Sequence, residues 1–209
     1  MNNQQGARST YNEYDNFSFH PHNVLLTLLL MGITALFLAL TVSFVYNRVQ
    51  NNLPPVQLPP IFLFNTLVLI GSSATLTWAK RAYKADDTAA YQQALIATIA
   101  LSLLFLGLQI FGWQQLFSRQ VFFNSGNAAS YLYLISGLHF AHVIAGLPFL
   151  ARFLQTARKR MKDPVSVLVY FSDPEKRLKL RLLTLYWHFL DALWIYLVLF
   201  FGLNYLING

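Results

Sequence analysis

The chain has 209 residues, of which 56% are hydrophobic and only 11% are charged. Soluble domains carry about 25% charged residues, so water cannot solvate most of this surface, and the composition predicts an integral membrane protein. The absence of cysteine excludes disulfides, thiolate metal sites and cysteine nucleophiles. The net charge of +7 does not indicate a nucleic-acid partner, because the basic residues lie in the connections between apolar segments.

Five apolar segments are long enough to cross a membrane as helices, since about 20 residues span a hydrocarbon core of about 30 Å. A polar tail, residues 1–23, precedes them. The alternating pattern of barrel strands is absent. The sequence therefore predicts an all-α fold, with one transmembrane domain over residues 24–209. Its spans are expected at about 24–47, 61–83, 91–116, 129–154 and 182–207.

The basic residues predict the orientation of these spans. Thirteen Lys and Arg residues fall in the tail and the second and fourth connections, whereas only Arg48 and Arg119 lie on the other side. Because cytoplasmic loops carry the excess of Lys and Arg, the N-terminus is expected in the cytoplasm and the C-terminus outside.

The long fourth connection carries a helix-start signal. Ser172, Asp173, Pro174 and Glu175 combine capping side chains with an early proline and a following acid. The last helix is therefore expected to begin here, before it enters the membrane. The apolar stretch 165–171 is too short to span, and would lie on the membrane surface or pack on a partner.

Two stripes of small residues predict close helix contacts, because membrane helices associate where small side chains let backbones approach. We expect both stripes to pack within this chain, with contact to another subunit as the alternative. The stripes are Ala94, Thr98 and Ser102 in the third span, and Gly137, Ala141 and Ala145 in the fourth.

Four titratable residues lie inside the last two spans: His139, His142, His188 and Asp191. A charged side chain in hydrocarbon costs roughly 2.5–3.5 kcal/mol on insertion scales, so these groups are expected to have a role. A hydrogen-bonded cluster that pins the last two spans together is one hypothesis. A proton relay and a metal or haem site are the others, although no cysteine or second carboxylate supports a metal.

Sequence templates for catalysis are missing. The chain has no glycine-rich phosphate loop, no nucleophile elbow, no H-E-x-x-H and no paired carboxylates within a span. We expect no active site in this chain by itself.

Two segments resemble the signatures of subunit III of haem–copper cytochrome c oxidases. They are residues 137–146, GLHFAHVIAG, and residues 186–194, YWHFLDALW. Asn65-Thr66, Ser73 to Trp78-Ala79 and Leu108-Gln109 also look like motifs of that family, so the resemblance extends from about Pro59 to the C-terminus. The family's common form has seven helices with a lipid-filled cleft, and five spans look like a short form lacking the first pair.

The resemblance implies a non-catalytic core subunit of a terminal oxidase in aerobic respiratory electron transport. Such a subunit packs on subunit I beside subunit II, holds phospholipids and supports proton uptake and turnover. It binds no cofactor; haem and copper reside in the partner subunits. The family motif residues are His139, His142, Trp187, His188 and Asp191. The implied location is a multi-pass protein of a bacterial cytoplasmic membrane.

Two departures from the family remove carboxylates. Pro59-Pro60-Ile61 stands where the family carries a membrane Glu, and Gly112-Trp113 stands where it often has Glu-Tyr. Roles of those acids therefore do not transfer. Alternative functions are an accessory subunit of a quinol oxidase or nitric oxide reductase, and a small proton-coupled transporter. The proteins and cofactors that co-purify with the chain distinguish them.

Overall fold

The computed structural model describes residues 21–51, 58–123, 126–161 and 163–208. This part of the chain contains six helices and no strand, and five of the helices are long and apolar enough to cross a membrane. The all-α fold with five candidate spans is confirmed. The helices are α1 (Pro21–Asn51), α2 (Ile61–Lys84), α3 (Thr88–Ser118), α4 (Asn127–Arg160), α5 (Pro164–Ser172) and α6 (Pro174–Asn208).

The helices extend beyond the predicted spans because a helix does not stop where the hydrocarbon stops. Residues 21–23, expected in the tail, belong to α1, while residues 1–20 lie outside the described part. The predicted start of the last helix is confirmed at Pro174. Asp173 Oδ1 accepts hydrogen bonds from the backbone N–H groups of Glu175 at 3.0 Å and Lys176 at 3.4 Å, which satisfies donors that a helix start leaves unpaired.

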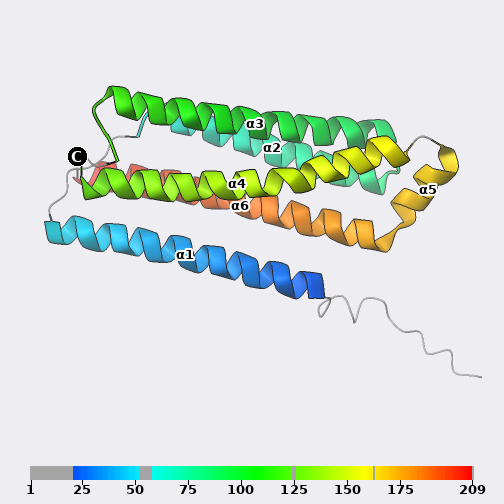
Figure 1. The fold of residues 1–209 in the computed structure, drawn as a ribbon, viewed down its shortest axis with the longest axis horizontal. Coiled ribbons are helices and arrows are strands. Elements are labelled where there is room, and N and C mark those ends of the chain that lie inside the picture. The colour runs from blue at the N-terminus through cyan, green and yellow to red at the C-terminus, as the bar shows by residue number, and fades with distance from the viewer. Residues whose placement is uncertain (1–20, 52–57, 124–125, 162, 209) are drawn as a thin grey trace, which may run out of the picture.

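Helices α2, α3, α4 and α6 run side by side as a bundle, and α1 lies along one side of it against α4 and α6 (Figure 1). The short helix α5 lies at the end where α6 begins, and the C-terminus lies at the opposite end. The interior is filled mainly by aromatic and branched side chains, among them Phe62, Phe105 and Trp194.

The stripe of small residues on α3 packs within the chain, as predicted. Ala94, Thr98 and Ser102 are fully buried. Across the contact with α2, the hydroxyl of Thr98 lies 2.9 Å from that of Thr75, and the hydroxyls of Ser102 and Ser72 are 3.3 Å apart. Small side chains thus allow two backbones to approach, and their hydroxyls bond across the gap.

The prediction that the stripe on α4 packs within this chain is wrong, while its contact with another subunit stays a prediction. Ala141 and Ala145 are exposed, and a Cβ added at Gly137 would meet nothing within 4 Å. The inward face of α4 instead carries larger side chains together with Gly146, where an added Cβ would lie 2.6 Å from Cζ3 of Trp187. Small residues at a spacing of four define a face, but the bulky partners across the contact decide which face turns inward.

The apolar stretch 165–171 forms most of α5, and part of it packs on its own chain. Tyr170 and Phe171 are buried against Tyr83 and Tyr91, and the hydroxyl of Tyr83 donates to the carbonyl of Tyr170 at 3.0 Å. The other face of α5 is open, with Val165, Leu168 and Val169 exposed.

Candidate functional site

His188 and Asp191 lie on the face of α6 that meets α2. Nδ1 of His188 is 2.5 Å from the hydroxyl of Ser73, and its Nε2 is 3.5 Å from the hydroxyl of Thr77. Asp191 is 6% exposed and interacts with the same Ser73 hydroxyl, while its Oδ2 has no hydrogen-bond partner among the described residues. Ser73 is therefore the centre of a short chain of polar groups.

Trp187 precedes His188 but points into the bundle. Its ring is 1% exposed, and its Nε1–H donates to the hydroxyl of Ser72 at 3.2 Å. Ser72 also pairs with Ser102 of α3. A single serine thus joins three helices, since each contributes one polar group to the same point.

His139 of α4 is fully buried between rings. Its imidazole lies 5.0 Å from the ring of Trp194 on α6, and 5.8 Å from Phe105 on α3, in an edge-on arrangement. Neither ring nitrogen has a hydrogen-bond partner within the described residues. The side chain packs like an aromatic residue while carrying two polar atoms.

His142 faces a different neighbour. Its Nδ1–H donates to the carbonyl of Leu138, one turn earlier in α4, at 2.7 Å, and its ring meets the edge of Phe37 on α1 at 5.9 Å. The carbonyl of His142 accepts a hydrogen bond from the hydroxyl of Tyr186 at 2.9 Å. The backbone of His142, rather than its ring, therefore joins α4 to α6.

The structure places the predicted site residues in two separate groups. His139 and His142 contact α1, α3 and α6 from α4, whereas His188 and Asp191 contact α2. No hydrogen bond joins the two groups among the residues that the structure describes. Nor does that part of the chain contain three or more His, Cys, Asp or Glu side chains able to hold a metal ion together.

Arg48, which the sequence indicated only as an external charge, joins two helices in the structure. Arg48 is 8% exposed, and its Nη1–H groups donate to the carbonyl of Asn204 at 2.7 Å and its side-chain oxygen at 3.1 Å. A cation beside the last carbonyls of a helix is favoured by the helix dipole. Arg48 thereby fastens the end of α1 to the end of α6.

A hydrogen bond between two buried amide side chains was also not predicted from the sequence. Asn65 of α2 donates from Nδ2 to Oε1 of Gln109 on α3 at 3.1 Å, and both side chains are 0% exposed. The sequence did contain a signal for such a pair, because an amide side chain inside an apolar span is costly unless it is hydrogen-bonded. Their partnership could not be read from positions 44 residues apart.

These features define a multi-pass helical membrane protein whose buried polar side chains join its helices. The sequence model of the family "Cytochrome c oxidase subunit III" matches residues 28–205. The chain belongs to this family.

Relatives called cytochrome c oxidase subunit 3 support this assignment. One from Synechocystis sp. is 29% identical over 198 residues, which cover 90% of this chain and 80% of the relative. One from Rhizopus stolonifer is 33% identical over 147 residues, covering 70% of this chain and 46% of the relative. One from Rickettsia felis, named as probable, is 32% identical over 136 residues, covering 65% of this chain and 45% of the relative. The chain spans about half the length of the last two.

Proposed function

We propose that the chain is a non-catalytic subunit of an oxygen-reducing haem–copper oxidase, in which it packs against the haem-bearing subunit I beside subunit II. Haem and copper belong to those partners in this proposal. Membership of the subunit III family supports it, and so do relatives named as cytochrome c oxidase subunits. In the proposed orientation the end with α5 faces the cytoplasm of a bacterial cell.

The observation that carries the proposal is the polar edge between α2 and α6. Ser73, Thr77 and His188 are each only half-buried. His188 lies about two turns beyond Arg181 in α6, and Ser73 lies about two turns before Lys80 in α2. Lipid tails offer no hydrogen bonds to such groups. A half-exposed polar edge at this depth therefore favours a neighbouring protein helix with polar side chains of its own.

Asp191 is the acidic residue that supports the proton-uptake part of the proposal. Its carboxyl lies beside Ser73 at the base of the edge, and Oδ2 is without a partner in the described part of the chain. Ionisable groups inside membranes face a bundle interior or a polar cavity rather than lipid. Because Oδ2 is buried within this chain, a partner helix cannot reach it. We infer that the supported proton uptake involves this carboxyl.

The remaining part of the proposal concerns phospholipid. Basic residues gather at the end of the bundle where α4 ends and α6 begins: Arg158, Lys159, Arg160, Lys176, Arg177, Lys179 and Arg181. Clusters of Lys and Arg beside the membrane attract anionic headgroups. This end would hold the protein against an anionic leaflet.

Site-specific photo-crosslinking tests the proposed packing. A photoreactive side chain at Ala192, exposed on α6 next to Asp191, is compared with one at Leu28, which is 63% exposed on α1. Illumination of membranes should give a haem-containing adduct from position 192 and little from position 28. Adducts with lipid alone at position 192, or equal capture from both positions, would contradict packing through the α2–α6 edge.

A further inference from the structure

We propose that four buried polar side chains, one from each helix of the bundle, bind internal water and form a hydrated layer in its centre. They are Asn65 of α2, Gln109 of α3, His139 of α4 and Trp194 of α6. The first three are 0% exposed and Trp194 is 1% exposed. The water would be a ligand of this chain alone, held without any partner subunit.

The four side chains lie at one level of the bundle. The indole of Trp194 stacks on Phe62 at 5.8 Å, and Phe62 is about one turn from Asn65. The same indole meets the edge of Phe105 at 5.1 Å, about one turn from Gln109. His139 contacts both the indole and Phe105. Asn65 and Gln109 therefore lie about one helical turn from rings that contact Trp194.

Their hydrogen bonding is incomplete, and both donors and acceptors lack partners among the described residues. Asn65 and Gln109 are the two members of the layer that hydrogen-bond to each other. Two atoms without a partner are obligate donors, Nε2 of Gln109 and Nε1 of Trp194, and one is an acceptor, Oδ1 of Asn65. The two unpartnered nitrogens of a neutral His139 add one donor and one acceptor.

Water fits this set because it donates and accepts at once. Buried polar atoms in native proteins are nearly always paired, with protein or with ordered water. Internal waters occur about once per 27 residues and make about three hydrogen bonds to such atoms. A water that accepts from an amide or indole N–H and donates to Asn65 or His139 would satisfy groups on different helices together.

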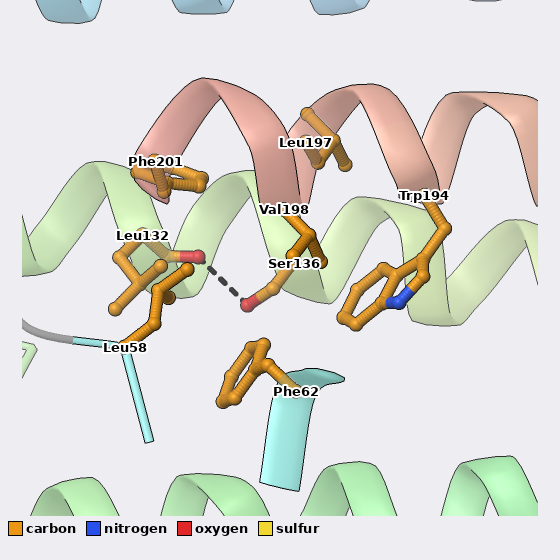
Figure 2. Close-up of a pocket in the computed structure, with 8 residues that line it drawn as sticks. All are labelled: Leu58, Phe62, Leu132, Ser136, Trp194, Leu197, Val198 and Phe201. Carbon is orange, nitrogen blue, oxygen red and sulfur yellow. Dashed lines mark hydrogen bonds between the residues drawn. The ribbon is translucent and has the colours of Figure 1, made fainter. Parts of the chain in front are cut away.

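The hollow beside Trp194 is not the place for this water. It is lined by Leu58, Phe62, Leu132, Ser136, Trp194, Leu197, Val198 and Phe201 (Figure 2). Its only hydroxyl, that of Ser136, already donates to the carbonyl of Leu132 at 2.7 Å and accepts from Nε1 of Trp113 at 3.1 Å. In Figure 2 the six-membered ring of Trp194 faces Ser136, and Nε1 lies on the far edge of the indole. We therefore assign the water to that far edge.

Magnetisation transfer from water tests the assignment directly. The full chain, labelled with ¹⁵N in its indoles and placed in lipid nanodiscs, is examined by NMR, and a Trp194→Phe variant identifies the signal of Trp194. Trp187 is the matched control, because it is equally buried but donates directly to Ser72. Transfer to Nε1–H should be stronger for Trp194 than for Trp187. Equal or absent transfer at Trp194 would overturn the proposal.

A substitution that preserves shape gives a second test. Benzothienylalanine at position 194 replaces the indole N–H with sulfur and keeps the ring outline. If Nε1–H bonds to water, the melting temperature of the purified protein should fall, because a hydrogen bond is lost. An unchanged or higher melting temperature would contradict the proposal, since it would show that the N–H was buried without a partner. The same replacement at Trp187 calibrates the loss of a direct bond.

Discussion

Gly146 of α4 and Trp187 of α6 are in such close contact that a Cβ on the glycine would lie 2.6 Å from Cζ3 of the indole and 3.0 Å from Cε1 of Tyr186. The absence of a side chain at position 146 therefore sets the spacing of these two helices. It also allows Nε1–H of Trp187 to donate to the hydroxyl of Ser72, which connects α6 to α2.

Gly146→Ala should destabilise the protein by about 1–3 kcal/mol, the usual cost of overpacking a core. The Trp187 ring would have to shift, and its hydrogen bond to Ser72 would weaken. Thermal unfolding of the purified protein measures the effect.

Gly137→Ala is the control for this substitution. It lies on the same helix with nothing within 4 Å of an added Cβ, and alanine favours a helix over glycine. We expect an unchanged or slightly higher melting temperature. Equal losses of stability in Gly146→Ala and Gly137→Ala would show that the close contact at Gly146 does not cause the destabilisation.

Asn65→Leu should destabilise by about 1–3 kcal/mol, because the buried Oε1 of Gln109 loses its donor. The double variant Asn65→Leu, Gln109→Leu should recover part of this loss, since no unpaired amide then remains at the contact. A double-mutant cycle on unfolding free energies measures the coupling. A coupling energy of zero would mean that the two amides do not act as a pair.

The sequence predicted the helical fold and its five spans because hydrocarbon imposes one requirement, a long apolar helix. The start of α6 was also predictable, since Asp173 and Pro174 act within one turn. Which face of α4 turns inward was not predictable, because it depends on rings such as Trp187, 41 residues after Gly146. The same limit applied to His188, whose partner Ser73 lies on another helix.

Arg48→Leu should release the end of α1 from α6, because both hydrogen bonds from the Nη1 of Arg48 to Asn204 disappear. The chain has no cysteine. Spin labels on cysteines introduced at the exposed Val45 of α1 and Leu203 of α6 therefore report only the distance between these two positions. The distance distribution should broaden toward longer values. Arg119→Leu removes an exposed basic residue of the neighbouring connection and should leave the distribution unchanged. A distribution unaffected by Arg48→Leu would contradict a fastening role.

The junction of α5 and α6 should loosen in acid. The hydrogen bond from Lys176 holds the pKa of Asp173 below its usual value of 3.8, and Nζ of Lys176 lies 2.8 Å from its Oδ2. A carboxyl with a lowered pKa stabilises the fold above its unfolded-state pKa, and the contribution is lost as the pH falls through the folded-state value. The transition is therefore expected below about pH 4.

A fluorophore on a cysteine introduced at Leu168 follows this transition, since that side chain is exposed on α5. The carboxyl is partly exposed, so the effect should be under about 1 kcal/mol. Asp173→Asn should remove the acid-dependent change. If the change persists in that variant, another group is responsible.

Gentle extraction of the native membrane, followed by purification through a tag on this chain, tests the central claim most directly. We expect haem absorbance and copper to co-purify with the chain as part of a larger assembly, and both to be lost when the chain is separated from its partners in stronger detergent. Haem or copper that stays with the isolated chain, or a chain extracted intact without any haem-bearing partner, would contradict the account.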